Sequence, residues 1–289
     1  MNILVTGANG QLGSELRLAA AKGRDRYVFT DVTSVPGVET VYLDITNIDA
    51  VRIICDSEDI DVIVNCAAYT NVDKAEDDSA TALLLNSTAV GTLATVAAER
   101  DAVLIHISTD YVFHGDKPTA YLETDEPDPQ TVYGASKLAG ERSIREFCSN
   151  HLILRLAWLY GDGGPSFLHT MLKLADGTRP TLKVVNDQRG NPTSAVAVAR
   201  HLRMLLERTD LHGIMHLTCE GETTWYDYAK EIFHVAGVKQ EVVPCTTAEF
   251  PRPAHRPANS ALEKAALARS GLPPMPHWKE ALREFMAEM

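Results

Sequence analysis

Short apolar runs alternate with helical patterns through the first half of the chain. The apolar runs show little internal alternation of apolar and polar residues, and they cover 3–6, 27–30, 62–66, 103–108 and 152–157. Strands that are buried on both faces have this pattern. Helical periodicity covers 11–22, 47–56, 79–99 and 133–147. The alternation predicts an α/β fold on a doubly wound parallel sheet of the Rossmann type.

The pattern changes after Gly161. Glycine and proline become frequent between 161 and 192, and the predicted elements become shorter and less regular. We expect a smaller α/β lobe here that covers a cleft. The stretch 194–218 is typical of a helix followed by a strand and is expected to return to the first sheet, and helices are expected near 261–269 and 276–288. The predicted domains are 1–160 with about 190–218, and about 161–189 with 219–289.

Length and charge restrict the class of protein. The chain of 289 residues suits one large α/β domain, or a cofactor domain with a smaller lobe. Its formal net charge of −12 would repel nucleic acid, so no nucleic-acid partner is expected. An anionic ligand would have to be held by local donors instead.

Cysteine usage and the N-terminus indicate the compartment. The five cysteines form no C-x-x-C pair, and their odd number favours a reducing environment. The chain opens on a strand-like run without the basic start and cleavage site of a signal peptide. Residues 79–98 carry no charge and are long enough to span a membrane, but their serine, threonine and asparagine residues favour a buried helix. We expect a cytoplasmic protein without a membrane partner.

A glycine-rich turn follows the first predicted strand and opens the first predicted helix. Gly7 permits a tight turn, Gly10 lets the backbone approach a pyrophosphate, and Gly13 allows close packing of helix and strand. Gln11 and Leu12 lie where free N–H groups at the helix start would hold phosphates. The alternative is a set of loop and cap glycines, but the strand–turn–helix context favours dinucleotide binding. The first domain is therefore predicted to bind the cofactor and the lobe to bind the substrate.

Further cofactor contacts are expected at the ends of the next strands. Asp31 follows the second strand, where a carboxylate can accept hydrogen bonds from an adenosine ribose. The same carboxylate would repel a 2′-phosphate, which favours NADH, although NADPH stays open. The other candidates are Asp44 and Ile45 beside the adenine, and Ala67, Ala68 and Tyr69 beside the cofactor.

A Y-x-x-x-K motif begins the predicted helix at 133–147. Tyr133 and Lys137 are four residues apart and so share one helical face, and Thr109 lies just past the strand at 103–108. A tyrosine is protonated at neutral pH and can donate a proton to a carbonyl oxygen as a hydride reaches its carbon. Lys137 would stabilise the tyrosinate and could hold the nicotinamide ribose, and Thr109 would donate a hydrogen bond to the carbonyl. Alone, the motif is more often a surface pair. Joined to the glycine turn, it predicts a reductase.

The chain resembles the extended short-chain dehydrogenase/reductases, and within them the dTDP-4-dehydrorhamnose reductases. The resemblance covers nearly the whole chain. Its residues are 7–13, 67–76 (AAYTNVDKAE), 108–113 (STDYVF), 133–137 (YGASK), 158–161 (WLYG), 186–193 (NDQRGNPT) and 256–260 (RPANS). The blocks around Thr109 and Asp187 are specific to this branch.

The resemblance implies reduction of the C4 ketone of dTDP-4-dehydro-β-L-rhamnose with NADPH or NADH. It implies that Thr109, Tyr133 and Lys137 are catalytic, and that 186–193 forms a loop over the cleft. The implied substrate contacts are Val72, Thr109, Asp110 and Trp158 at the sugar and Arg256 at the pyrophosphate, with Arg252 as a second candidate. Trp158 could equally be a core aromatic residue, and 186–193 a structural turn.

The resemblance also bears on metal and assembly. Some relatives hold magnesium between subunits through an acid that Glu15 matches, but a further acidic position is Val196 here, so we expect no metal. A homodimer is the assembly that the resemblance suggests.

Other readings stay open. A nucleotide-sugar dehydratase or epimerase shares the fold, but dehydratases of this group place Asp-Glu after the catalytic threonine, whereas Asp110 and Tyr111 stand here. A non-catalytic regulatory subunit of the methionine adenosyltransferase type shares much of the pattern, although it need not keep Thr109, Tyr133 and Lys137. A reductase of another nucleotide sugar would differ in pocket shape, which sequence does not resolve.

Overall fold

A parallel sheet forms the centre of the larger part of the molecule. The computed structural model describes residues 1–21, 23–208 and 210–289. Within these residues the sheet has seven strands in the order β11-β6-β5-β4-β1-β2-β3, and all neighbours run parallel. The strands are β1 (Asn2–Thr6), β2 (Arg26–Asp31), β3 (Val41–Tyr42), β4 (Val62–Asn65), β5 (Val103–Thr109), β6 (His151–Leu156) and β11 (Gly213–His216). The predicted doubly wound sheet is confirmed.

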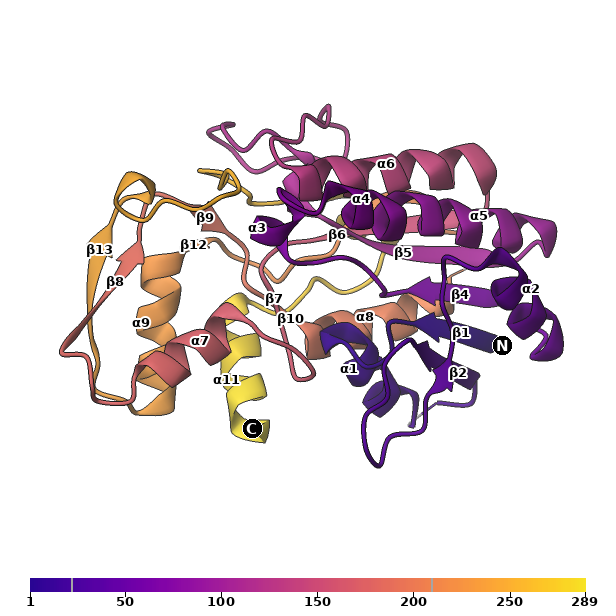
Figure 1. Cartoon of the computed structure of the whole chain (residues 1–289). Helices are drawn as coiled ribbons and strands as arrows, with labels where there is room; N and C mark the ends of the chain where they lie inside the picture. Colours follow the sequence, from indigo (N-terminus) through magenta and orange to yellow (C-terminus); the bar gives the residue numbers. More distant parts are fainter. Residues whose placement is uncertain (22, 209) are drawn as a thin grey trace.

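Helices cover both faces of this sheet (Figure 1). One face carries α1 (Gln11–Ala20) and α8 (Ala195–Leu206), which pack against each other. The other face carries α2 (Ile48–Ser57), α5 (Ala89–Glu99) and α6 (Val132–Phe147). Each face buries its own apolar core, with Leu16 and Leu202 on the first side and Val51 and Leu93 on the second. Strands between two such layers must be apolar on both sides, which explains the unbroken apolar runs.

The predicted elements of this part agree closely with the structure. The five predicted strands are β1, β2, β4, β5 and β6, and the expected helix at 11–22 is α1, although residue 22 lies outside the described residues. The stretch 194–218 forms α8 and then β11, which pairs with β6, so it does return to the sheet; residue 209 lies outside the described residues. The short strand β3 was not predicted, because its two residues are too few to give a strand pattern.

The uncharged helix is interrupted in its middle. It runs from α4 (Ser79–Leu83) through a π-helical segment (Leu84–Thr88) into α5. By length and composition alone, Ser79–Glu99 could cross a membrane. In the structure, however, the buried side of α5 packs against β4, β5, α2 and α6, as expected for a core helix. The π-helical segment places Asn86 so that its amide bonds both main-chain groups of Tyr69 and the hydroxyl of Ser136.

A smaller group of elements stands beside the carboxyl ends of the sheet strands (Figure 1). Its strands β8 (Thr181–Val185) and β13 (Glu241–Cys245) pair in parallel, with α7 (Phe167–Leu174), α9 (Trp225–Ala236) and α11 (Trp278–Glu288) packed nearby. The remaining α-helices and strands of the described residues are α3 (Val72–Ala75), α10 (Ala265–Ser270), β7 (Leu159–Tyr160), β9 (Arg189–Gly190), β10 (Thr193–Ser194) and β12 (Thr223–Thr224), and short 3₁₀ helices cover Asp110–Val112 and Thr247–Glu249. The predicted helices near 261–269 and 276–288 correspond to α10 and α11. The domain boundaries themselves stay a prediction.

A buried ion pair holds α6 on the sheet. Arg155 on β6 donates from Nε and Nη2 to the two carboxylate oxygens of Glu141, at 2.9 and 2.6 Å. The Ser108 hydroxyl on β5 donates to the same carboxylate at 2.5 Å. The Glu141 and Arg155 side chains are 2% and 1% exposed, so water screens neither charge. The bidentate geometry fixes the helix relative to two neighbouring strands.

We expect Glu141→Ala to lower the free energy of unfolding by about 3–5 kcal/mol, because it leaves the Arg155 guanidinium buried and unpaired. Urea denaturation measures the change. Glu146 is an exposed glutamate on the same helix, and Glu146→Ala should change stability by no more than about 0.5 kcal/mol. The double variant Glu141→Leu, Arg155→Met should recover most of the loss. A Glu141→Ala protein as stable as Glu146→Ala would show that the pair does not hold the helix.

Candidate active site

The glycine turn is built as the motif requires. Gly7 has a φ of 64°, and a Cβ on it would lie 2.5 Å from the Ala67 nitrogen of the loop after β4. A Cβ on Gly13 would lie 2.4 Å from the Gly7 oxygen. A Cβ on Gly10, by contrast, would lie 3.4 Å from its nearest neighbour, the Gly7 carbonyl oxygen. Packing therefore demands glycine at 7 and 13, while Gly10 leaves open space above the turn.

That open space suits the pyrophosphate of a dinucleotide. Gly10 is the N-cap of α1, and among the described residues no side chain caps this helix. The first-turn N–H groups of Gln11, Leu12 and Gly13 therefore stay available to an anion. Gln11 also ties the turn to the smaller lobe, since its side-chain amide donates to the Pro165 carbonyl at 3.0 Å. The turn thus fits the cofactor predicted from the sequence.

Asp31 lies at the end of β2 beside the same turn. Its carboxylate accepts from the main-chain N–H of Asn9 at 3.1 Å and from the N–H and hydroxyl of Thr33 at 2.9 and 2.8 Å. These bonds hold the carboxylate in place at the rim of the cleft. A fixed negative charge here would oppose a 2′-phosphate.

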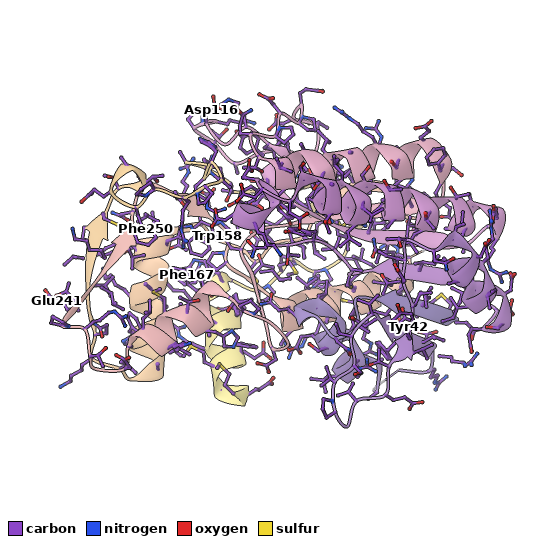
Figure 2. The ribbon with its side chains drawn as sticks, viewed as in Figure 1. Tyr42, Asp116, Trp158, Phe167, Glu241 and Phe250 are labelled. Atoms are coloured by element: carbon purple, nitrogen blue, oxygen red, sulfur yellow. The ribbon has the colours of Figure 1, made fainter. Side chains whose placement is uncertain are left out.

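One large cavity of about 1200 Å³ runs from the glycine turn to the smaller lobe. It exceeds the usual range for one drug-sized ligand, roughly 300–1,000 Å³, and so suits two bound molecules. Phe167, Trp158 and Phe250 lie between the sheet and the β8–β13 pair (Figure 2). The predicted site residues that line the cavity are Gly7, Gly10, Gln11, Leu12, Gly13, Asp31, Asp44, Ile45, Ala67, Ala68, Val72, Thr109, Asp110, Tyr133, Lys137, Trp158, Arg252 and Arg256.

Tyr69 does not line this cavity. Its hydroxyl donates to Asp78 at 3.2 Å, and its main-chain groups bond Asn86. Residues 67–69 lie in an irregular loop after β4, where side chains need not alternate, so Ala67 and Ala68 can face the cavity while Tyr69 turns toward Asp78. The structure therefore gives no support to the prediction that the Tyr69 side chain contacts the cofactor.

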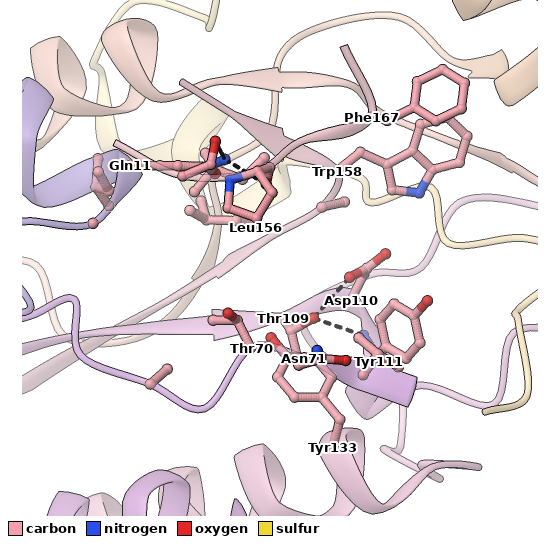
Figure 3. Close-up of a pocket in the computed structure, with 18 of the residues that line it drawn as sticks. Gln11, Thr70, Asn71, Thr109, Asp110, Tyr111, Tyr133, Leu156, Trp158 and Phe167 are labelled. Atoms are coloured by element: carbon pink, nitrogen blue, oxygen red, sulfur yellow. Dashed lines mark hydrogen bonds between the residues drawn. The ribbon is translucent and has the colours of Figure 1, made fainter. Parts of the chain in front are cut away.

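Thr109, Tyr133 and Lys137 all line the cavity. Figure 3 shows Thr109 and Tyr133 on the same side of it. Tyr133 and Lys137 lie on one face of α6, whose N-cap Thr131 accepts from the Gly134 N–H at 3.0 Å. A Cβ on Gly134 would lie 2.2 Å from the main-chain carbonyl oxygen of Tyr111, so the start of α6 lies directly against the turn that follows β5. The Thr109 hydroxyl donates to Asp110 at 2.8 Å and accepts from the Tyr111 N–H at 3.2 Å.

Burial shifts the proton equilibria of these groups. It raises the pKa of Tyr133, which the nearby Thr109 hydroxyl partly offsets. It lowers the pKa of Lys137 to about 8, against the opposing effects of Glu141 and Cys66. Tyr133 is therefore a protonated donor at neutral pH, and Lys137 can change charge close to it.

Asp110 carries an unusual carboxyl group. It is 4% exposed, and burial raises its pKa to about 6 although the Thr109 and Ser260 hydroxyls oppose the shift. Its Oδ2 has no hydrogen-bond partner within the described residues. A buried oxygen without a partner at the cavity wall is suited to accept a bond from a ligand hydroxyl.

Trp158 forms part of an aromatic wall. Its ring stacks on Trp225 with centroids 3.4 Å apart, its Nε1 donates to Ser260 at 3.0 Å, and a Cβ on Gly190 would lie 2.6 Å from it. Its φ of 48° is rare for a bulky residue and is held by this packing. Trp158 packs against the core and also lines the cavity, so it is both a core aromatic residue and a candidate substrate contact.

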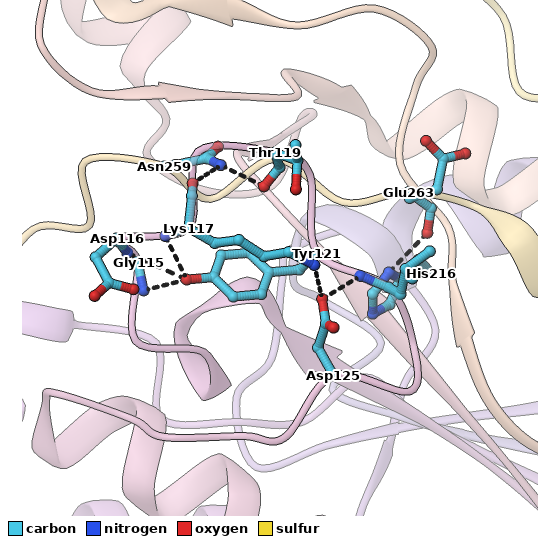
Figure 4. A network of polar contacts seen from close by, with 10 residues as sticks. Gly115, Asp116, Lys117, Thr119, Tyr121, Asp125, His216, Asn259 and Glu263 are labelled. Carbon is cyan, nitrogen blue, oxygen red and sulfur yellow. Dashed lines mark hydrogen bonds and ion pairs between the residues drawn. The ribbon is translucent and has the colours of Figure 1, made fainter.

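A polar network joins the loop after β5 to the C-terminal segment that carries Arg256 (Figure 4). In that network Asn259 donates to the Lys117 and Thr119 carbonyls at 2.6 and 2.8 Å, and the Tyr121 hydroxyl accepts hydrogen bonds from three main-chain N–H groups.

Arg256 itself donates to the Tyr111 hydroxyl at 3.0 Å and pairs with Asp73 at 2.8 Å. A guanidinium at the cavity wall is thereby fixed in position.

The segment 186–193 mostly joins parts of the chain. Asn191 donates to the Gly221 carbonyl and accepts from the Leu262 N–H, and Asp187 accepts from Thr247. Of this segment, Gln188 lines the cavity. Most of this segment therefore serves as a structural turn. The residue of it that lies against the cleft is Gln188.

Several cavity residues were not predicted. Phe167, Arg179, Lys183 and Trp225 line the cavity from the smaller lobe. Their sequence context is ordinary for a lobe of short elements, and only the two cations could have been singled out as candidates for an anionic ligand. Tyr111 was read as a departure from a dehydratase motif, and burial raises the pKa of its hydroxyl to about 12.

The described part of the chain contains no group of three or more His, Cys, Asp or Glu side chains arranged to hold a metal ion. Glu15 is buried, and burial raises the pKa of its carboxyl group, with Asp162 adding to the shift. The absence of a metal in the working protein stays a prediction.

Known proteins share this sequence and this fold. The chain is 41% identical to the dTDP-4-dehydrorhamnose reductase of Escherichia coli K12, over 100% of this chain and 98% of that protein. It is 40% identical to a probable dTDP-4,6-dihydroxy-2-methyloxan-3-one 4-ketoreductase of Streptomyces antibioticus, over 98% and 94%. The crystal structure of the Bacillus anthracis dTDP-4-dehydrorhamnose reductase in complex with NADP matches with a TM-score of 0.92, at 36% identity over 100% and 99% of the two chains.

Residues 1–289 also match the family model described as the RmlD substrate binding domain. The family model thus covers the whole chain, and the E. coli reductase is matched over nearly its full length. The chain therefore belongs to the dTDP-4-dehydrorhamnose reductase family.

Proposed function

We propose that the protein reduces the C4 ketone of dTDP-4-dehydro-β-L-rhamnose to give dTDP-L-rhamnose, with NADPH or NADH as reductant. The observation that carries this proposal is the convergence of Thr109, Tyr133 and Lys137 in the cavity that begins at the glycine turn. Family membership supports the substrate, and the NADP complex of the Bacillus anthracis relative supports the cofactor class.

The chain's own residues account for binding. Gly7 to Gly13 and the first-turn N–H groups of α1 would hold the pyrophosphate of the cofactor. Asp31 would accept from the adenosine ribose, with Asp44 and Ile45 near the adenine. Bound there, a reduced nicotinamide supplies a hydride to the substrate's carbonyl carbon.

The proton comes from Tyr133. Its hydroxyl would donate to the carbonyl oxygen as negative charge develops there. Thr109 would turn its hydrogen from Asp110 to the same oxygen, which stabilises the charge before the proton arrives. The Lys137 ammonium would then stabilise the tyrosinate, because opposite charges attract strongly at a buried site.

The sugar and its diphosphate have separate contacts. Asp110 Oδ2, which has no partner in the described structure, would accept from a sugar hydroxyl, with Val72 and Trp158 forming the apolar walls. Arg256, with Arg252 nearby, would donate to the diphosphate, and guanidinium geometry suits that group. Cytoplasmic location and a homodimer stay predictions from the sequence.

A second candidate is reduction of another keto sugar nucleotide. The Streptomyces antibioticus relative, a probable 4-ketoreductase of a different dTDP-sugar, favours this reading at nearly the same identity. A dehydratase is disfavoured, because the position after Asp110 holds Tyr111, whose hydroxyl accepts from Arg256 and is not acidic. The intact Thr109–Tyr133–Lys137 set also disfavours a purely regulatory subunit.

The test is stoichiometric oxidation of NADH and of NADPH with dTDP-4-dehydro-L-rhamnose formed in situ, together with the product mass. We expect one cofactor consumed for each sugar reduced, and a product heavier by two hydrogens. Product formation without net consumption of cofactor would identify a dehydratase or epimerase. Tight cofactor binding without turnover would favour another keto sugar or the regulatory role.

Tyr133→Phe should bind cofactor normally but lower kcat about a hundredfold or more, because only the proton donor is removed. Cofactor affinity is measured by fluorescence titration and kcat by initial rates. Tyr121→Phe removes a buried hydroxyl that serves the loop 115–117 and provides a control for general damage. A Tyr133→Phe enzyme with wild-type kcat would remove Tyr133 from the proposed chemistry.

Asp31→Ala should move cofactor preference from NADH toward NADPH, because the fixed carboxylate at the cavity rim would repel a 2′-phosphate. The ratio of kcat/KM for NADPH to that for NADH should rise at least about tenfold. Asp25→Ala is a suitable control, since Asp25 pairs with the N-terminus away from the cavity. If both variants give the wild-type ratio, Asp31 only shapes the turn.

The basic side of the pH profile should report Lys137. Burial lowers the pKa of this lysine to about 8, and the proposed role needs its ammonium form. Below that pH Lys137 is charged, so kcat/KM for the cofactor should be constant there and fall as pH rises through about 8. Initial rates at saturating sugar measure the profile. A kcat/KM that stays flat up to about pH 10 would contradict a required ammonium at Lys137.

A further inference from the structure

A row of buried polar side chains runs across three neighbouring strands and ends at Lys137. Thr6 on β1 pairs in register with Asn65 on β4, and Asn65 pairs with His106 on β5. The Thr6 hydroxyl donates to Asn65 Oδ1 at 2.6 Å, and Asn65 Nδ2 lies 2.9 Å from His106 Nδ1. His106 Nε2 in turn lies 3.2 Å from Lys137 Nζ. These residues are at most 2% exposed, so bulk solvent does not compete for their hydrogen bonds.

The main chain fixes the orientation of the Asn65 amide. The N–H of Ala67 donates to Asn65 Oδ1 at 3.1 Å. A main-chain N–H can only donate, so the atom it meets must be the amide oxygen. The other end of the amide, which faces His106, must then be the NH₂ group. This assignment does not depend on the Thr6 hydroxyl, which could either donate or accept.

The amide in turn selects the tautomer of His106. Because Asn65 Nδ2 donates, His106 Nδ1 must be the ring nitrogen with the lone pair. Burial and the nearby Lys137 both hold the pKa of His106 well below its usual range, so the ring is neutral. A neutral imidazole carries one N–H, which must therefore be on Nε2 and point at Lys137 Nζ.

We infer that Asn65 and His106 act as a positioning pair for Lys137, in which Asn65 fixes the Nε2–H tautomer so that the lysine faces an N–H rather than a lone pair. An ammonium group has three donors and no acceptor, so it gains nothing from an opposing N–H. A neutral amine can accept from it. The pair therefore weakens the charged form of Lys137, while the Ile107 carbonyl, 2.6 Å from Nζ, holds the lysine in place.

The other titratable groups around Lys137 do not replace this effect. Glu141, one turn further along α6, favours the ammonium, but its carboxylate is shared with Arg155 and Ser108. Cys66, from the loop after β4, is a thiol whose pKa burial raises to about 12, so it is uncharged. Tyr133 on the same helix is also uncharged, because burial raises its pKa. His106 is thus the neutral group that meets Nζ directly.

The catalytic consequence rests on the proposed function, but the tautomer does not. The first test is therefore ¹⁵N NMR of the ligand-free protein labelled at histidine. The signals of His106 are assigned by their loss in His106→Gln. From about pH 6 to about pH 9, which brackets the lysine transition, we expect Nε2 to carry the proton and Nδ1 the lone pair. A proton on Nδ1 would overturn the inference, whatever the protein catalyses.

The second test uses the pH profile of the reductase reaction. Asn65→Ala removes the NH₂ group that selects the tautomer, so His106 can turn a lone pair toward Lys137. The basic limb of kcat/KM should then move up by roughly half to one pH unit, the effect of one hydrogen bond. Thr6→Val keeps the Ala67–Asn65–His106 contacts and serves as the matched control, with the limb at its wild-type position. If the basic limb does not move in Asn65→Ala, the pair has no effect on Lys137. If the wild-type protein shows no reductase turnover at all, the proposed function is contradicted instead.

Discussion

The arrangement of the site depends on how helix α6 lies on the sheet. Its inward face carries Tyr133, Lys137 and Glu141 at intervals of one turn, so a single docking geometry places all three. The Glu141–Arg155 pair and Ser108 fix that geometry against two strands. At the other end, Gly134 lets the helix approach the end of β5, where Thr109 stands. Tyr133, the proposed proton donor, and Thr109, proposed to bind the carbonyl oxygen, are therefore held by the same contact.

The parallel sheet supplies the second constraint. Its strand ends meet at one edge, which brings the glycine turn after β1, the loop after β4 and Thr109 at the end of β5 to the same cavity. The same in-register pairing lines up Thr6, Asn65 and His106 beneath that cavity. The buried polar row and the open site above it are thus two consequences of one strand order.

The sequence predicted the parts of the site that local geometry controls. The glycine spacing and the four-residue interval from Tyr133 to Lys137 are properties of a turn and a helix, and both could be read directly. The cofactor contact expected at Tyr69 stays a prediction. Its hydroxyl bonds Asp78, because the course of one loop, which sequence does not give, decides which of three successive side chains faces the cavity. Phe167, Lys183 and Trp225 could not be found, since they reach the cavity only through the packing of the smaller lobe. His106 gave no signal at all, because its partners come from distant segments.

The most direct measurement of the central claim follows the hydrogen itself. The cofactor is deuterated at the reactive carbon of its nicotinamide, the sugar nucleotide is reduced, and the product is examined by NMR. The account predicts one deuterium on C4 of the sugar, the carbon that bore the ketone, for each cofactor oxidised. Deuterium at another carbon, or a transformed sugar with the cofactor still fully deuterated and reduced, would contradict the reduction of a C4 ketone in this cavity.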